Sequence, residues 1–248
     1  IKIYPIFLGL VYLAHRRFRT VLATGVTVLS AFLIGIGFGG GWQNTADWFT
    51  KVLPAASTMT PYPSNQSLRA VVARLFTSNE FQVPVLNKDN LLTILQPSII
   101  ESPALKTIVT TGAILLVFGV TVWVMWKPAP QAAATTFTLD FALGITLMLL
   151  LTPVVWDQYF VHLLIPLLLL GQVARRSSLY RLLVLGSMLL IALQRYWRYV
   201  LLYASSPLLM MTGLSCVVLL WLTLLRLRTH PLETPIPPFA ETASGSTR

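Results

Sequence analysis

The sequence has little charge and almost no cysteine. Only 10% of its 248 residues are charged, whereas 55% are hydrophobic; an average soluble domain has about 25% charged residues. This composition excludes an ordinary soluble globular domain. The single cysteine, Cys216, excludes a disulfide framework and any cysteine-based metal site.

Acidic residues are scarcer than basic ones. The 18 lysines and arginines outnumber the 8 aspartates and glutamates, which gives a formal net charge of +10. The excess is scattered between apolar runs and does not form the dense basic face used in nucleic-acid binding. No internal repeat is visible either, which argues against a transporter built from repeated halves.

Long apolar runs dominate the rest of the sequence. A hydrocarbon core about 30 Å thick needs roughly 20 apolar residues in a helix. We therefore predict an all-α, polytopic transmembrane helix bundle of a cell (plasma or inner) membrane, with a transmembrane domain over residues 1–228. Its seven predicted spans, of which the first is interpreted as the cut end of a longer helix, are residues 1–14, 20–39, 107–126, 139–156, 159–173, 179–193 and 207–225.

The positions of the basic residues predict the orientation of these spans. Lysines and arginines in short loops mark the cytoplasmic side, and the cluster at Arg16–Arg19 places the first turn there. The exterior loop 40–106 then lies outside, and residues 229–248, rich in Pro, Ser and Thr, form a disordered cytoplasmic tail. Arg195 and Arg198 do not follow this rule, because they lie on a predicted exterior turn at 194–205. Either that turn is well solvated or the two arginines meet an anionic group.

The centre of the exterior loop has the pattern of an amphipathic helix. Apolar residues recur at i, i+3, i+4, i+7 and i+8 from Leu68 to Phe76. Arg69 and Arg74 flank this stripe, outside the core, and Asn65 can cap the helix start. The helix is expected to lie on the membrane surface with its arginines at phosphate depth; alternatively it packs on the bundle and its arginines are merely solvated.

A second polar cluster follows the fourth predicted span, between Thr152 and Pro166. At helical spacing Gln158, Tyr159 and His162 share one face, while Asp157 can cap the helix. Pro166 removes the hydrogen bond to the carbonyl of His162. We predict a polar cavity near the exterior; alternatively His162 is an ordinary interface residue.

Four stretches of the sequence together match a known pattern. They are Lys2-Ile3-Tyr4-Pro5 with the arginines ending at Arg19, Asn65-Gln66-Ser67-Leu68 with Arg74, Thr152-Pro153-Val154-Val155-Trp156-Asp157, and the Leu-rich helix containing Pro166. These stretches resemble glycosyltransferase family 87, which has the C-type fold and includes polyprenyl-phosphate-mannose-dependent α-mannosyltransferases. The resemblance covers most of residues 1–225, and family members commonly have histidines where this sequence has Gln158 and Tyr159. It implies an all-α membrane enzyme whose catalytic carboxylate lies upstream of residue 1.

From this resemblance we predict a glycosyltransferase, of which this sequence is an incomplete C-terminal portion. The enzyme is expected to transfer a hexose from a polyprenyl phosphate to a hydroxyl of a glycan or glycolipid acceptor on the extracytoplasmic face, and mannose is the leading candidate for that hexose. The partners are membrane lipid and this lipid-linked sugar phosphate, which is a substrate; no cofactor, metal or nucleic acid is expected. A transporter or lipid flippase, and a catalytically silent scaffold subunit, are the alternatives. The predicted substrate-binding residues are Lys2, Asn65, Arg69, Arg74, Asp157, Gln158, Tyr159, His162, Arg195 and Arg198.

Overall fold

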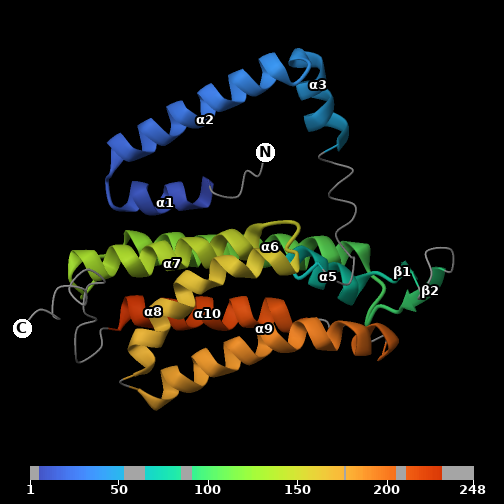
Figure 1. Ribbon diagram of the computed structural model, residues 1–248. Coiled ribbons are helices and arrows are strands. Elements are labelled where there is room, and N and C mark those ends of the chain that lie inside the picture. Colours follow the sequence, from blue (N-terminus) through green and yellow to red (C-terminus); the bar gives the residue numbers. More distant parts are fainter. Residues whose placement is uncertain (1–5, 53–64, 85–90, 176, 205–210, 231–248) are drawn as a thin grey trace, which may run out of the picture.

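The computed structural model describes residues 6–52, 65–84, 91–175, 177–204 and 211–230, and it is a bundle of long helices (Figure 1). The predicted all-α membrane bundle is therefore confirmed. Among the described residues, four helices are long and apolar enough to cross a membrane, and two shorter apolar helices lie beside them. The bundle consists of α1 (Ile6–Ala14), α2 (Phe18–Phe38), α6 (Pro103–Trp126), α7 (Ala133–Leu151), α8 (Leu164–Ala174), α9 (Ser178–Ala204) and α10 (Thr212–Thr229).

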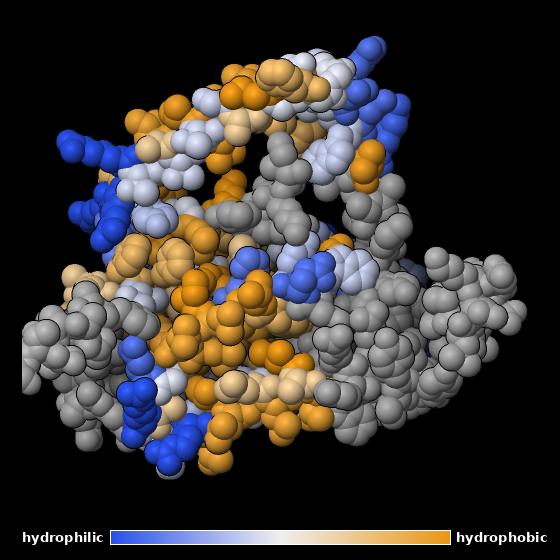
Figure 2. Space-filling view, in the orientation of Figure 1, coloured by the Kyte–Doolittle hydropathy of each residue, from blue (hydrophilic) through white to orange (hydrophobic). Residues whose placement is uncertain are grey.

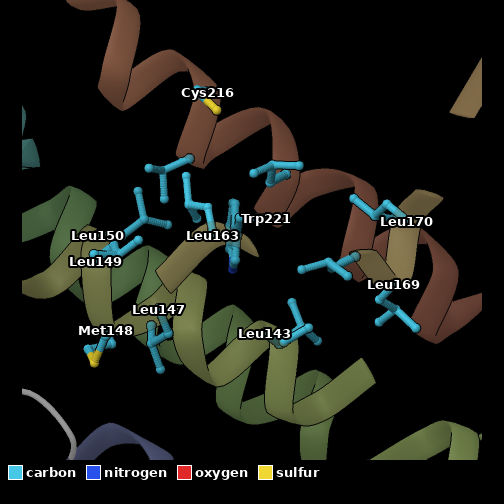
Figure 3. Close-up of a cluster of buried hydrophobic side chains, with 14 of the residues drawn as sticks. Leu143, Leu147, Met148, Leu149, Leu150, Leu163, Leu169, Leu170, Cys216 and Trp221 are labelled. Carbon is cyan, nitrogen blue, oxygen red and sulfur yellow. The ribbon is translucent and has the colours of Figure 1, made fainter. Parts of the chain in front are cut away.

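Helix α7 lies at the centre of the bundle. Leu143, Leu147 and Leu150 on this helix are buried, and Figure 3 shows them in one apolar cluster with Leu169 and Leu170 of α8 and Trp221 of α10. The Trp221 Nε1–H donates a 2.8 Å hydrogen bond to the hydroxyl of Thr121 on α6. A buried indole N–H needs such a partner, so this bond allows Trp221 to fill the core.

Two predicted boundaries are wrong. The fourth span was expected to reach Trp156, but α7 ends at Leu151, because proline disfavours helical geometry in the residue before it and Pro153 follows Thr152. The predicted exterior turn at 194–205 is helical as far as Ala204. The polar and aromatic residues after Leu193 include no Gly or Pro, so the chain has no helix breaker there.

The long loop between α2 and α6 has more structure than the sequence predicted. It contains α3 (Gly41–Asp47), the π-helix η1 (Trp48–Val52) and the expected central helix α5 (Leu68–Phe76). It also contains an antiparallel hairpin of β1 (Asn79–Pro84) and β2 (Leu91–Gln96), with Asn79 opposite Gln96. The alternation of polar and apolar residues in β1 is a strand signal that we missed.

The chain reversals gather at two ends of the bundle. In Figure 1 the turns α1–α2, α6–α7 and α8–α9 and the end of α10 lie at the left, whereas α5 and the hairpin lie at the right. Figure 2 shows hydrophilic residues at the left edge and hydrophobic residues across the helices. We call the left end the basic end, because its exposed lysines and arginines are Arg16, Arg17, Arg19, Lys127, Arg175, Arg181 and Arg226.

An ionic cluster around a buried carboxylate joins four helices at the basic end. The carboxylate of Asp140 on α7 is wholly buried and accepts a 2.8 Å hydrogen bond from Arg228 Nε on α10. Its other oxygen lies 2.9 Å from His15 Nε2 at the end of α1. Arg228 also donates to the carbonyl of Lys127, at 3.0 Å, so the cluster ties α1, α10 and the end of α6 to α7.

Helix α1 packs on α7 through this cluster and a close apolar contact. Gly144 of α7 leaves no room for a β-carbon, which would lie 2.8 Å from Val11 Cγ2. Two turns closer to the basic end, the ring of Phe137 contacts Tyr12 and His15, and the Arg17 guanidinium lies 4.3 Å from the centre of that ring. These contacts fix the position of the first described helix.

A carboxylate organises the base of the hairpin. Glu101 Oε2 accepts hydrogen bonds from the Ser98 hydroxyl at 2.7 Å, the Ser78 hydroxyl at 2.8 Å and the Ser78 N–H at 2.9 Å. The bond from Ser98, and then those from Ser78, hold the pKa of Glu101 below its ordinary value. A carboxylate with a lowered pKa stabilises the folded state above its ordinary pKa, and this stabilisation is lost as pH falls through the lowered value.

We therefore expect the hairpin base to open at acidic pH. In hydrogen–deuterium exchange, protection of the segment containing Ser78 should fall as pH drops through the lowered pKa of Glu101. The Glu101→Gln variant should have weaker protection at neutral pH and lose this pH dependence, because the amide does not ionise in this range. A wild-type pH dependence that persists in Glu101→Gln would show that another group controls the opening.

Candidate functional site

The N-terminus of α5 is held against the end of α7. Ser67 is the N-cap of α5, because its Oγ accepts a 3.1 Å hydrogen bond from the Ala70 N–H. The same hydroxyl donates to the Pro153 carbonyl at 2.8 Å. The prediction that Asn65 caps the helix is wrong, because Ser67 is the capping residue. The capping side chain also makes a tertiary contact.

Asn65 connects the two polar stretches that the sequence singled out. Its Nδ2 donates to the Pro153 carbonyl at 3.1 Å, and its Oδ1 accepts from the backbone N–H groups of Val155 at 2.9 Å and Ser67 at 3.1 Å. The Gln66 N–H donates to the Val155 carbonyl at 2.9 Å. The structure therefore brings together the Asn65 motif and the turn after α7, which are far apart in the sequence.

Gln66 extends this contact to α10. Its side chain is buried, and its Oε1 accepts a 3.3 Å hydrogen bond from the backbone N–H of Gly213. The first N–H groups of a helix have no partner within the helix, so this amide satisfies one of them. We call residues Asn65, Gln66 and Ser67, with the carbonyls and N–H groups that they contact, the α5 seat.

The two arginines of α5 lie in different environments. Arg69 is exposed, whereas Arg74 is wholly buried, and Arg74 Nη1 donates to the Asn65 carbonyl at 2.9 Å. The prediction that both lie outside the core is wrong for Arg74, because Ala70, Val72 and Ala73 are also buried and α5 is covered on nearly every side. The alternative in which α5 packs on the bundle fits the structure.

Burial changes the electrostatics of Arg74 without neutralising it. Desolvation lowers the pKa of Arg74 to about 10, because removal from water disfavours the charged form. The side chain remains positively charged at neutral pH. A fixed positive charge therefore lies inside the end of the bundle that carries the α5 seat.

The turn after α7 presents its predicted site residues on a 3₁₀-helix, η2 (Asp157–Leu163). At three residues per turn, residues three apart are aligned, so Tyr159 and His162 share a side and Gln158 does not. Gln158 and His162 are exposed, and Tyr159 is half-buried. Pro166 lies in the first turn of α8, where the missing N–H removes no established helical bond.

A sequence comparison identifies the protein family. The profile described as glycosyltransferase family 87 matches residues 1–153, more than half of the chain. The chain belongs to glycosyltransferase family 87. No curated protein and no solved structure matches it.

Membership makes this family 87 protein a membrane glycosyltransferase and favours transfer over the alternatives of transport and scaffolding. The match includes all of α5 and extends to Pro153, so it covers the residues on both sides of the bonds that Asn65 and Ser67 make to Pro153. It is shorter than the resemblance expected from the sequence. The turn at Asp157 and the arginines of α9 lie outside it.

For the remaining predicted site residues of the family 87 protein, the structure does not describe the side chains. Arg195 and Arg198 lie in the part of α9 that follows Leu193, where only the backbone is described, and the same holds for Asp157 in η2. Lys2 lies outside the described residues. Their assignment to substrate binding stays a prediction.

Sequence reasoning missed several residues that the structure makes prominent. Gln66 and Ser67 were noted only as part of a motif, although both are buried in the α5 seat. Asp140 was not considered at all. The sequence did indicate that this residue matters, because an acidic side chain inside a predicted transmembrane span needs a charged or polar partner.

Metal ligation finds no support in the described part of the family 87 protein. Across those residues, no group of three or more His, Cys, Asp or Glu side chains is placed to hold an ion. The α5 seat consists of hydrogen bonds within the protein, and the positive charges of Arg69 and Arg74 lie next to it.

Proposed function

We propose that this family 87 protein transfers a hexose from a polyprenyl phosphate to a hydroxyl of a glycan or glycolipid at the extracytoplasmic face of the cell membrane. The supporting observation is the α5 seat, which holds a helix carrying one buried and one exposed arginine at one end of the bundle. A long isoprenoid chain stays in the bilayer, so its sugar phosphate must be met at the membrane interface. Mannose is the first sugar to test.

The charge distribution supports the extracytoplasmic assignment. The exposed turns at the opposite end of the bundle carry the arginines and lysines of the basic end. Such loops face the cytoplasm in most multi-spanning proteins. The end with α5 and the hairpin would then face outward, where no nucleotide sugar is available and a lipid-linked donor is required.

Arg69 is proposed to bind the donor phosphate directly, because its side chain is exposed next to the α5 seat. A guanidinium binds phosphate through two parallel hydrogen bonds and stabilises the charge that develops on the leaving phosphate. Arg74 adds positive potential from inside. The general base that deprotonates the acceptor is assigned to none of these residues.

The other predicted residues complete the proposed binding site. Tyr159 and His162, aligned on η2, are proposed to contact the sugar or the acceptor, together with Gln158 and Asp157. The remaining cations, Lys2, Arg195 and Arg198, are proposed as further contacts to phosphate.

A donor comparison tests the proposal. The full-length protein in proteoliposomes should release free polyprenyl phosphate from polyprenyl-phosphate mannose or from a polyprenyl-phosphate hexose of another kind when a glycolipid acceptor is present. Soluble nucleotide sugars should give no transfer. Turnover of a nucleotide sugar, with none of any lipid-linked donor, would contradict the proposed donor class.

The two arginines of α5 should respond differently to substitution. Arg69→Gln should raise the donor KM by an amount corresponding to about 1.5–3 kcal/mol, the usual value of a hydrogen bond to a charged group, and leave thermal stability unchanged. Arg74→Gln should lower stability as well, because its guanidinium is buried against the Asn65 carbonyl.

Donor kinetics and thermal unfolding of both variants, measured side by side, check this prediction. Arg181→Gln at the basic end is the matched control, since that arginine is also exposed. An unchanged donor KM in Arg69→Gln would remove this residue from the proposed phosphate site.

A further inference from the structure

Two adjacent isoleucines are exposed between the hairpin and α6. The side chains of Ile99 and Ile100 are 55% and 53% exposed, although neither lies in a helix or strand. Single exposed apolar residues are common on protein surfaces and need no explanation. Two adjacent exposed isoleucines, close to further exposed apolar residues, do need an explanation.

The backbone of this pair is held rigidly to α5. The N–H groups of Ile99 and Ile100 both donate to the Leu75 carbonyl, at 3.0 and 3.2 Å, and the Ser102 N–H donates to the Phe76 carbonyl at 2.9 Å. These carbonyls belong to the last turn of α5, where they have no partner within the helix. Any force that fixes the isoleucines therefore also fixes α5.

The polar residues next to the pair are engaged with the hairpin. Glu101 and Ser98 bond to each other and to Ser78. The polar side chains of the segment thus have partners within the protein, although Glu101 is exposed, whereas the two large apolar side chains have no such polar anchor.

Exposed apolar residues recur in α6, which begins three residues after Ile100. Leu105 and Ile108, in the first two turns of that helix, are also exposed, Ile108 at 66%. Helix α6 has 24 residues, about 36 Å at 1.5 Å per residue, which exceeds the hydrocarbon thickness of about 30 Å. With residues 107–126 spanning the hydrocarbon core, as the sequence predicts, the first turn of α6 and the preceding isoleucines fall in the interfacial layer.

We propose that Ile99 and Ile100 insert into the interfacial layer of the lipid bilayer and set the depth of α5 in the membrane. The partner is the lipid surface itself. Through the bonds to Leu75, the inserted pair holds the exposed Arg69 at the level of the headgroups. Only that last step rests on the proposed function; the insertion does not.

Spin labelling measures the depth directly. In a Cys216→Ala background, nitroxide labels are attached to Ile99→Cys and Ile100→Cys in phosphatidylcholine vesicles. Their accessibility to oxygen, which concentrates in lipid, is compared with that to a water-soluble nickel chelate. Ile108→Cys is the lipid reference, and Thr93→Cys, on an exposed position of β2, is the aqueous reference.

We expect both isoleucine sites to favour oxygen over nickel, as Ile108 does, and Thr93 to show the reverse. Nickel accessibility equal to that of Thr93 would overturn the proposal. Protection from both reagents would also overturn it, because a protein surface would then cover the pair. The measurement needs no enzymatic activity, so its failure is distinct from failure of the proposed glycosyl transfer.

A functional variant tests the consequence for α5. The double change Ile99→Ser with Ile100→Ser should raise the KM for a lipid-linked donor several-fold and leave thermal stability in detergent unchanged, because both side chains are exposed in the folded protein. A wild-type KM would show that the pair does not set the depth of α5.

Discussion

The Asp140→Ala variant is expected to lose about 3–5 kcal/mol of unfolding free energy, the usual cost of breaking a buried ion pair by removing one partner. Asp140 is wholly buried and bonds to Arg228 at 2.8 Å and to His15 at 2.9 Å. Without the carboxylate, the guanidinium of Arg228 stays buried with an uncompensated charge. Denaturant unfolding in detergent micelles measures the loss.

Two further variants separate the charge from the packing. Adding Arg228→Met to Asp140→Ala should recover part of the lost stability, because the double variant leaves no unpaired charge between α7 and α10. His15→Gln should have a smaller effect, since His15 is partly exposed and an amide can donate the same bond. Equal losses in the single and double variants would show that the ion pair is not the source of the stability.

Substitution of Asn65 is expected to have the largest effect on activity. Asn65→Ala removes the acceptor of the Val155 N–H and a donor to the Pro153 carbonyl. Each buried polar group left without a partner costs about 1–3 kcal/mol, so α5 should detach locally from the end of α7. Because about 1.4 kcal/mol corresponds to a tenfold change, kcat/KM for glycosyl transfer should fall about tenfold or more.

The control for Asn65 lies in the hairpin. Asn79 is also partly buried, but its Nδ2 bonds to the nearby Thr77 carbonyl, so Asn79→Ala should leave transfer nearly unchanged. Thermal unfolding must be measured with the kinetics of both variants. If Asn65→Ala lowers stability and keeps wild-type kcat/KM, the α5 seat is structural and lies apart from the reaction.

Local sequence pattern was sufficient to locate most helices. Each predicted span corresponds to a helix, because helix length and apolar content are properties of a single segment. The expected helix in the exterior loop was found as α5, since its apolar spacing is also local. Boundaries were less secure, as α7 and α9 show.

The alignment of residues on a helix depended on the kind of helix. Gln158, Tyr159 and His162 were predicted to share one face at α-helical spacing, but η2 is a 3₁₀-helix, which keeps Tyr159 aligned with His162 and turns Gln158 away. The sequence gives weak signals for this choice, because the two helices differ by one position in their hydrogen bonding. Packing at the end of α7 determined it.

The sequence by itself determined that the chain is a membrane helix bundle, and it predicted that the short loops with clustered basic residues share one end. Hydrophobicity and charge act on each segment separately, so they can be read without knowing the neighbours. Only the tertiary structure decided that Asn65 meets Pro153, that Arg74 is buried while Arg69 is exposed, and that Asp140 pairs with Arg228. These contacts join distant segments through short-range hydrogen bonds, and which groups come within 3 Å is fixed by helix packing as a whole.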